Sequence, residues 1–290
     1  MPELPEVETV RAGLSRLIVG KAIRGVDFDW PKSFPNSGHD VDQFLIGSKI
    51  TAVNRRAKVL MIELNTNYTL VIHLKMTGQL VFVGGERFGA GHPNDSLINR
   101  LPDRSTRITF DLGDDEKLFF NDQRKFGWVR LVPTIEVPNI DFFKKVGPEP
   151  LTDEFTPIIF LSQLKKRSNS TIKAAILDQT VLAGVGNIYA DESLWGAKIH
   201  PGTRVRDISD KKLKTLRDEI RHVLNLSIEK GGSTDRNYVN AEGKKGSYID
   251  FARVFRQEGK PCPRHPDTII IKTRVASRGT HLCPRCQILK

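Results

Sequence analysis

Two pairs of side chains near the end of the sequence have the types and spacing of metal ligands. Cys262 and His265 form the first pair, Cys283 and Cys286 form the second, and seventeen residues separate the pairs. Ligands two residues apart can bend around one ion, and two such pairs fit a tetrahedral zinc site. The chain has only these three cysteines, and an odd, clustered number disfavours disulfides. We expect one structural zinc ion; the alternative is two unrelated groups of thiols with a histidine nearby.

The amino terminus could supply a nucleophile. Removal of Met1 would expose the secondary amine of Pro2 beside the carboxylates of Glu3 and Glu6. An α-amine has a pKa of about 8, so a usable fraction is uncharged at neutral pH, and such amines form Schiff bases with carbonyl-like carbons. The alternative is a proline-rich helix start in which the two acidic residues complement the helix dipole.

A glycine-containing turn could bind an anion. The sequence GVGN at residues 184–187 precedes a predicted helix, and the free backbone N–H groups at a helix start favour a phosphate. The alternative is an ordinary connection between helices that needs glycine only for its backbone conformation.

The first half of the chain has the pattern of one helix followed by many short strands. Apolar residues recur at helical spacing over residues 5–19, with Pro5 in the first turn and Gly20 at the end. The segment 84–105, rich in Gly, Pro, Asn and Asp, predicts a long loop. Many short strands joined by turns predict an antiparallel sandwich or barrel. Alternating or β-branched runs place the strands at Ala22–Asp29, Val59–Leu64, Thr69–Leu74, Leu80–Val83, Arg107–Leu112, Lys117–Asn121 and Trp128–Val132.

The second half has a helical pattern. Prolines between residues 133 and 150 indicate a linker into a second domain. Apolar periodicity predicts helices over 171–178, over 188–195 with Asn187 as the N-cap, and over 213–228, ending before two glycines. The residues between the two ligand pairs, including Thr268–Thr273 and Arg278–Leu282, predict a β-hairpin.

Composition limits the class of protein and its partners. The 290 residues are 39% hydrophobic and 27% charged, which allows two domains with substantial cores and a small appended module. The formal net charge of +11 makes a polyanion the favoured large partner. No stretch reaches the roughly 20 apolar residues of a membrane span, and the amino terminus lacks the features of a signal peptide. We expect a soluble monomer of the cytoplasm or nucleoid that does not associate with membranes.

Six motifs, in order along the whole chain, resemble those of the formamidopyrimidine-DNA glycosylases. They are MPELPEVETVR at 1–11, HLKMTG at 73–78, DQRKFG at 122–127, AGVGNIYADE at 183–192, GGST at 231–234 and RGTHLCPRC at 278–286. Leu4 favours this branch over the endonuclease-VIII-type relatives, which tend to carry glycine there.

The resemblance implies an α+β fold and a repair reaction. The fold would be an N-terminal catalytic β-sandwich flanked by helices over residues 2–134, a helix-two-turn-helix DNA-binding domain over 150–240, and a C-terminal β-hairpin zinc finger over 250–290. The activity would be excision of oxidised purines, such as 8-oxoguanine and formamidopyrimidines, from double-stranded DNA. β- and δ-elimination at the abasic site would follow, with the DNA in a cleft between the domains.

The resemblance also implies roles for single residues at the reacting sugar. Pro2 would attack C1′, Glu3 would act as the acid/base that opens the sugar ring, and Glu6 would support the site. Lys58 would lie near the phosphates of the lesion. The alternative for Lys58 is a solvated basic strand end together with the two arginines that precede it.

A second group of residues would bind the DNA. An enzyme that acts on a base in a duplex must extrude the nucleotide and fill the gap, a role that the resemblance gives to Met76, Arg124 and Phe126. Without the resemblance, a methionine or phenylalanine in a strand-rich segment is interpreted as a core residue. A lone histidine on a strand is likewise interpreted as a structural residue. The residues that contact the phosphates of the DNA, or lie beside them, would be His73, Lys125, Asn187 and Arg278.

The sequence departs from the family pattern at three places. His265 stands where the usual finger has cysteine, with one extra residue between the pairs, and Lys125 replaces an arginine while keeping its charge. The segment Asp235–Ile249 departs within the expected lid over the damaged base, so lesion preference is the least defined property. An endonuclease-VIII-like glycosylase for oxidised pyrimidines is one alternative. A non-catalytic damage-binding protein is another, against which Pro2 and Glu3 argue.

Overall fold

The computed structural model describes residues 1–233 and 248–289, which divide into two compact units. The first consists of Met1–Lys144 and the described part of Gly231–Ser247. The second consists of Lys145–Lys230 and the described part of Tyr248–Lys290. Residues 235–247 of the expected lid lie outside the described part of the chain.

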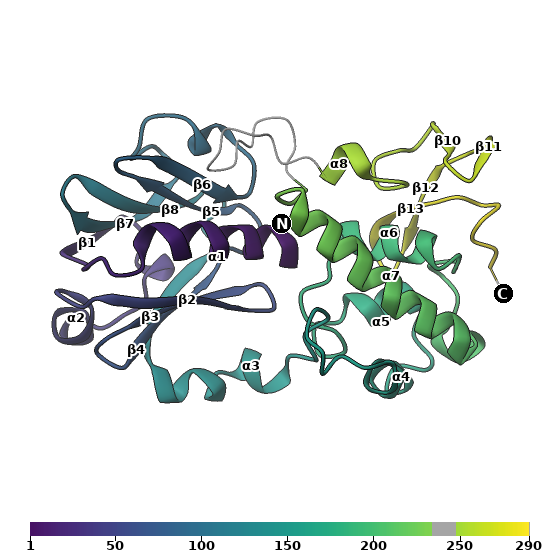
Figure 1. The fold of residues 1–290 in the computed structure, drawn as a ribbon, viewed down its shortest axis with the longest axis horizontal. Helices are drawn as coiled ribbons and strands as arrows, with labels where there is room; N and C mark the ends of the chain where they lie inside the picture. Colours follow the sequence, from purple (N-terminus) through teal and green to yellow (C-terminus); the bar gives the residue numbers. More distant parts are fainter. Residues whose placement is uncertain (234–247, 290) are drawn as a thin grey trace. The chain divides into compact units, whose positions relative to one another are not determined.

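The first unit contains two antiparallel sheets that face each other, which confirms the predicted sandwich (Figure 1). One sheet has the strand order β1 (Gly25–Phe28), β7 (Thr106–Gly113), β8 (Glu116–Asp122), β5 (Gly78–Val83) and β6 (Arg87–Gly91). The other has the order β2 (Ile50–Arg56), β3 (Val59–Leu64), β4 (Tyr68–His73) and β9 (Trp128–Pro133).

The chain crosses from one sheet to the other within two of the motifs. It leaves β4 at His73 and enters β5 at Gly78, and it leaves β8 at Asp122 and enters β9 at Trp128. His73 pairs with Trp128 in one sheet and Gly78 pairs with Asp122 in the other. The two crossovers therefore lie side by side at one end of the sandwich.

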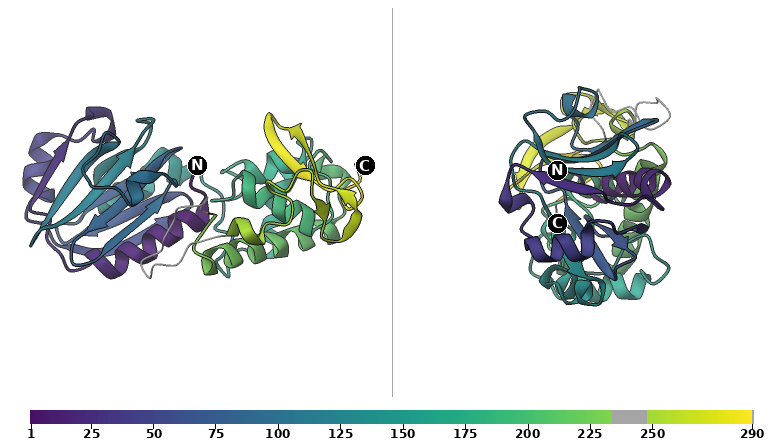
Figure 2. Two further views of the ribbon diagram at one scale, coloured as in Figure 1. Left: turned by 90° about the horizontal axis from the view of Figure 1, so that it is seen from above. Right: turned by 90° about the vertical axis from the view of Figure 1, so that its left-hand side faces the viewer.

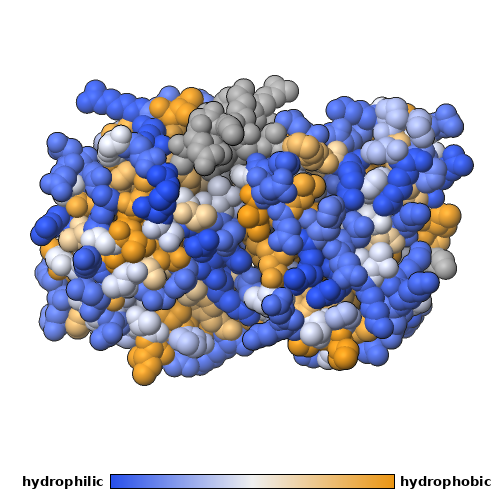
Figure 3. All heavy atoms as spheres, in the orientation of Figure 1, coloured by the Kyte–Doolittle hydropathy of each residue, from blue (hydrophilic) through white to orange (hydrophobic). Residues whose placement is uncertain are grey.

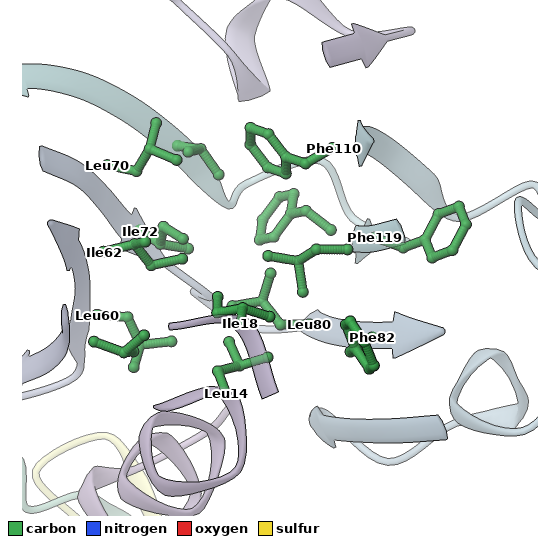
Figure 4. Packing of buried hydrophobic residues seen from close by; sticks show 14 of the residues in the cluster. Leu14, Ile18, Leu60, Ile62, Leu70, Ile72, Leu80, Phe82, Phe110 and Phe119 are labelled. Carbon is green, nitrogen blue, oxygen red and sulfur yellow. The ribbon is translucent and has the colours of Figure 1, made fainter. Parts of the chain in front are cut away.

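Apolar side chains from both sheets meet in one core, which helix α1 (Leu4–Ile18) closes along one side (Figure 4). The helix packs against β2 and β6, which are edge strands of the two sheets. Its helical periodicity turns Leu14 and Ile18 into the core, where strand alternation supplies Leu60, Ile62, Leu70, Ile72, Leu80, Phe82 and Phe110. Phe119 pairs with Val81 and lies on the other face of its sheet.

The prediction of a plain loop over residues 84–105 is wrong. The segment contains the edge strand β6 and one turn of 3-10 helix, η3 (Asp95–Leu97). Phe88 and Ala90 of β6 are buried, and the Phe88 ring fills the space that a side chain at Gly13 of α1 would need. Two buried apolar side chains on a short strand are a weak pattern beside so many Gly, Pro and Asn residues, so the sequence does not reveal the strand.

Short helical segments fill the other connections of the first unit. The sequence pattern predicts neither these segments nor β2, whose outer residues are polar. The segments are η1 (Pro31–Ser33), α2 (Gly38–Asp40), η2 (Val41–Leu45), η4 (Thr134–Asn139) and α3 (Asp141–Lys145), the last of which ends one residue inside the second unit.

The second unit combines helices with two β-hairpins (Figure 2). Helices lie at or near all three predicted positions, and α4 and α8 are additional. The helical segments are α4 (Pro157–Lys165), α5 (Ile172–Leu177), α6 (Asn187–Gly196), η5 (Val205–Asp207), α7 (Asp210–Glu229) and α8 (Tyr248–Phe251). The hairpins are β10 (Pro261–Cys262) with β11 (His265–Ile269), and β12 (Ile271–Val275) with β13 (Arg278–Leu282).

Two local predictions in this unit are wrong. The N-cap of α6 is Gly186, which has extended backbone angles, and Asn187 is the first helical residue. The side chain of Asn187 bonds to a distant carbonyl instead of capping its own helix. The strand that pairs with β13 is predicted to begin at Thr268, but it begins at Ile271. Thr268 belongs to β11, in the other hairpin.

The face of the molecule in Figure 3 is largely hydrophilic, with hydrophobic side chains in small scattered groups. In the part of the chain that the structure describes, no helix is both long and apolar enough to cross a membrane.

Candidate functional site

The amino terminus is held by two carboxylates at the start of α1. Pro2 is buried, and Glu3 and Glu6 are only 3% and 7% exposed. The backbone N–H of Glu3 donates to Oε2 of Glu6 at 2.8 Å, and the Glu3 side chain caps the first turn in return. The other oxygen of Glu6 accepts the N–H of Ser233 at 2.7 Å. Glu6 therefore ties the helix start to the GGST motif.

Lys58 lies in the tight turn between β2 and β3, and this turn is anchored to α1. Arg55 binds Glu8 of α1 at 2.8 Å and donates to the carbonyl of Ala57 at 2.9 Å. Ala57 has a φ of +53°, so the turn depends on such support. Lys58 is 6% exposed. The same helix thus holds both the amino terminus and the turn that carries Lys58.

His73 lies on the strand next to this turn, paired with Val59. Burial lowers the pKa of His73 to about 3, and the positive charges of Lys75 and Lys58 add to the effect. The backbone N–H of Lys75 donates to Nδ1 at 3.0 Å, so the ring proton is on Nε2. His73 is therefore neutral at physiological pH and can offer an N–H group, but no charge, to an anion.

The two crossovers are joined by the buried carboxylate of Asp122, which is 0% exposed. Its Oδ2 accepts the N–H groups of Phe126 at 2.8 Å and Gly127 at 2.7 Å. Its Oδ1 accepts the N–H of Arg124 at 3.1 Å and the hydroxyl of Thr77, which in turn accepts the same Arg124 N–H at 3.1 Å. One carboxylate thus fixes the shape of the 122–127 loop and joins it to the neighbouring crossover.

The predicted gap-filling side chains project from these crossovers into solvent. Met76 is 37% and Phe126 is 54% exposed, and the Arg124 guanidinium lies over the Phe126 ring at 4.8 Å. The structure therefore does not place this methionine and phenylalanine in the core. Lys125 points elsewhere, because its ammonium lies over the Trp30 ring at 4.5 Å.

In the second unit, the structure brings Asn187 beside the start of β13. Nδ2 of Asn187 donates to the carbonyl of Gly279 at 3.0 Å, which leaves its second hydrogen for another acceptor. Arg278, the residue before Gly279, is exposed. The amide donor is therefore one residue away from the exposed arginine, an arrangement in which both could bind one phosphate.

A buried ion pair holds β13 on the helices. Nζ of Lys173 and Oδ1 of Asp191 are 2.6 Å apart, and both side chains are 0% exposed. Lys173 also donates to the Thr280 hydroxyl at 2.7 Å and the Gly279 carbonyl at 3.1 Å. Asp191 accepts the backbone N–H of His281 at 2.9 Å. These bonds use all three ammonium donors of Lys173 and fix the chain directly after Arg278.

The four predicted metal ligands form one cluster, in which all ligand atoms lie within 4.8 Å of one another. The sulfurs of Cys262 and Cys286 are 3.7 Å apart, close to the roughly 3.8 Å between two thiolates on a tetrahedral zinc ion with bonds of about 2.3 Å. Burial raises the pKa of Cys286 to about 12, so its thiolate needs a cation nearby. Cys262, His265, Cys283 and Cys286 can therefore hold a metal ion.

The cluster packs against Trp195 near the end of α6. The guanidinium of Arg264, which lies between two of the ligands in sequence, sits 3.8 Å over the Trp195 ring. It also donates to the carbonyls of Trp195 at 2.7 Å and Gly196 at 3.0 Å. Since α6 starts at Asn187, one helix connects the amide donor to the metal cluster.

The residues that position the others have no recognisable signature in the sequence. Asp122, Asp191 and Thr77 stand inside the quoted motifs without an assigned role, and Lys173 stands outside them. The one signal in the sequence that these residues have a structural role is a charge in an apolar context. Asp122 ends an apolar strand, and Lys173 lies between apolar residues of a short helix. Neither pattern identifies a partner far away in sequence.

Two family descriptions match successive parts of the chain. Residues 1–129 match the formamidopyrimidine-DNA glycosylase N-terminal domain, and residues 146–238 match the helix-two-turn-helix domain of the same glycosylases. Together with the sandwich and the Cys/His hairpins, these matches define a protein of the helix-two-turn-helix glycosylase class.

Curated relatives agree over the full length of the chain. The formamidopyrimidine-DNA glycosylases of Latilactobacillus sakei and Streptococcus pyogenes serotype M28 are 39% and 41% identical to it, over 99% of this chain and 98% of theirs. The chain belongs to the formamidopyrimidine-DNA glycosylase family.

Solved structures of similar proteins include complexes with DNA. The Lactococcus lactis Fpg bound to DNA with an abasic site has a TM-score of 0.86 and 34% identity, over 99% of both chains. MutM bound to DNA with carbocyclic 8-oxoguanine has a TM-score of 0.85 and 35% identity, over 99% of this chain and 100% of that chain.

We predict that Lys173→Met destabilises the second unit by about 3–5 kcal/mol, because it leaves the Asp191 carboxylate buried without its cation. Guanidinium unfolding followed by the fluorescence of Trp195, with Trp30 and Trp128 replaced by Phe, would measure this. Lys272→Met, which breaks the exposed pair with Glu258, is the matched control and should change stability by less than about 1 kcal/mol. Equal effects of the two substitutions would contradict the structural role given to Lys173.

Proposed function

We propose that the chain excises oxidised purines, 8-oxoguanine and formamidopyrimidines, from double-stranded DNA and then cleaves the strand at the abasic site. The observation that carries the proposal is the position of Pro2, buried at a helix start that two carboxylates hold in place. Family membership supports the reaction class. The relatives' complexes with abasic-site and 8-oxoguanine DNA support the substrate.

In the proposed reaction, the nitrogen of Pro2 forms a bond to C1′ of the damaged nucleotide. The bond between C1′ and the base breaks, and the base leaves with the electron pair and takes up a proton. Glu3 takes the proton that the bonded nitrogen loses and gives a proton to the ring oxygen of the sugar, so that the ring opens and an iminium forms between Pro2 and C1′. The iminium acidifies the hydrogens at C2′, and successive β- and δ-elimination then release the two ends of the strand.

Lys58 and His73 would hold the phosphates beside the lesion. Lys58 would supply charge, and His73 would supply the Nε2–H group of a neutral ring. The base must leave the stack before C1′ becomes accessible. Met76 and Phe126 would fill the space it leaves, and Arg124 would hydrogen-bond the unpaired partner base.

The second unit would bind phosphates through Asn187 and Arg278. A zinc ion held by the Cys/His cluster would take no part in the reaction. Its contribution would be to fold the hairpins, which are too small to form a core of their own. The four ligand atoms fit such an ion, as their separations indicate.

We predict that the mature protein begins at Pro2 and that borohydride reduction joins it covalently to DNA containing 8-oxoguanine opposite cytosine. Mass spectrometry of the adduct would locate the bond at the Pro2 nitrogen. A tag fused directly before Pro2 should abolish trapping and cleavage, because the nitrogen becomes an amide without a basic lone pair. Attachment at Lys58 would contradict the assignment, and a panel of oxidised pyrimidine duplexes would test the endonuclease-VIII-like alternative.

We predict different salt dependences for the two residues of the phosphate clamp. Arg278→Ala should weaken binding to all duplexes and reduce the slope of log affinity against log salt by roughly one, because one fewer counterion is released. Asn187→Ala should weaken binding without changing the slope, since the amide is uncharged. Titrations at several salt concentrations would measure both, with Lys214→Ala on the exposed side of α7 as control. A change in lesion discrimination at constant slope would assign Arg278 to base recognition instead.

We predict that the protein contains about one zinc ion per chain and that His265→Ala loses it, whereas His265→Cys retains it. Elemental analysis after dialysis against a chelator would give the stoichiometry. His281 cannot easily replace His265, because its ring faces Asp191 at 3.3 Å and Glu258 at 3.3 Å. A full zinc content in His265→Ala would show that the histidine is not a ligand.

A further inference from the structure

A contact between Lys125 and Trp30 ties the 122–127 loop to a part of the chain outside the motifs. The Lys125 ammonium lies 4.5 Å over the Trp30 ring, within the range of a cation–π interaction. Trp30 stands two residues after the end of β1, at the N-cap of η1. None of the motifs that carry the family resemblance includes Trp30. The loop that carries Arg124 thus has a partner to which no role has been assigned.

Strand pairing brings the two partners to the same end of the five-stranded sheet. Phe28, the last residue of β1, pairs with Ile108 of β7, and Ile108 pairs with Phe120 of β8. Since both pairings are antiparallel, β1 and β8 run in the same direction. The chain therefore leaves β1 toward Trp30 at the end of the sheet where it leaves β8 toward Lys125.

Arg107 fixes the turn that carries Trp30 to this end of the sheet. The arginine is 4% exposed, and its guanidinium pairs with the carboxylate of Asp29, the residue before Trp30. Its Nε donates to the carbonyl of Asp122 at 3.1 Å. One buried side chain therefore holds both the residue before Trp30 and the residue that begins the 122–127 loop, so the ring presents a fixed surface to the loop.

Lys125 is the residue of this loop whose conformation most needs support. Its φ is +58°, in the left-handed region that a residue with a Cβ atom adopts only at a cost. Asp122 binds the backbone N–H groups of Arg124 and Phe126 on either side of it. The contact with the Trp30 ring favours the left-handed conformation at Lys125. With that conformation it favours the present arrangement, in which the Arg124 guanidinium lies over the Phe126 ring.

We propose that Trp30 is a positioning residue for Arg124, that it acts through Lys125, and that this contact sets how strongly the protein distinguishes the base opposite the lesion. The inference rests on the proposed function, in which Arg124 hydrogen-bonds the unpaired partner base. While the ring holds Lys125, the loop presents Arg124 in one orientation, which suits one arrangement of acceptors on that base. Without the ring, Lys125 leaves the left-handed conformation more readily and Arg124 adapts to other bases. The Lys125 ammonium thus supports the loop instead of binding a phosphate.

The test measures single-turnover release of 8-oxoguanine from four duplexes that differ only in the base opposite the lesion. The discrimination ratio is the rate with the best partner base divided by the rate with the worst, so it does not respond to a uniform change in the amount of folded protein. We expect Trp30→Leu to lower this ratio about two- to fivefold, the factor that a cation–π contact at an exposed site contributes.

Trp30→Phe should keep the parental ratio, because it retains an aromatic face. In the described part of the chain, the buried Nε1 of Trp30 has no hydrogen-bond partner that this substitution would remove. Arg130→Met is the matched control. It removes a guanidinium 4.5 Å over the Trp128 ring, a contact of the same kind and length, and should also keep the parental ratio.

Lys125→Met tests the other side of the contact, at an exposed position where the substitution does not disturb the core. It should lower the discrimination ratio by the same factor as Trp30→Leu, and the double variant should show no further loss, because both substitutions remove one interaction. The slope of log affinity against log salt should stay parental in Lys125→Met, since the ammonium releases no counterion from the DNA.

Several results would overturn the inference. They are a parental ratio in Trp30→Leu or in Lys125→Met, losses that multiply in the double variant, or a salt slope reduced by about one in Lys125→Met, which would assign the ammonium to a phosphate. A parent protein that releases 8-oxoguanine equally well opposite all four bases would refute the inference and leave the proposed function intact. A parent protein that releases no base from any duplex would refute the proposed function itself.

Discussion

The hydrogen bond from the backbone N–H of Glu3 to the carboxylate of Glu6 holds the first turn of the chain, and the candidate site is built outward from it. Chain ends are mobile unless something restrains them, and a nucleophile at the amino terminus would otherwise be the least ordered atom of the protein. Here the first turn continues into a helix whose apolar side chains are buried in the core between two sheets. The packing of this helix against the sandwich therefore also restrains the position of Pro2.

Buried carboxylates also fix the conformation of backbone segments elsewhere in the molecule. Asp122, Asp191 and Glu192 are each 0% exposed, and each accepts backbone N–H groups from a segment far away or from a tight loop. A buried charge is costly unless hydrogen bonds compensate it, so each of these groups strongly favours one conformation of its loop. Arg124 and Phe126 are carried on the loop that Asp122 holds, and Arg278 comes shortly before His281, whose backbone Asp191 holds.

The sequence predicted the features that depend on local pattern. Strand alternation was enough for an antiparallel sandwich, periodicity found the long helix α7, and ligand spacing found the cluster of Cys262, His265, Cys283 and Cys286. The sequence pattern does not predict the role of a residue whose interaction partner lies far away along the chain. The local pattern predicts Asn187 as a helix cap, because its bond to Gly279, 92 residues away, leaves no local signal in the sequence. Strand β6 is not predicted because its pairing with β5 and its packing on α1 leave little periodicity among its glycines.

Two of the attachments of the C-terminal hairpins respond differently to temperature. One is ionic, through Lys173 and Asp191, and the other is apolar and aromatic, through Trp195. The desolvation penalty of buried charges falls on heating, because the hydration of ions becomes less favourable, whereas apolar stabilisation per unit area levels off. As the temperature rises, the buried ion pair therefore makes a larger relative contribution to the stability of the β-hairpin that positions Arg278.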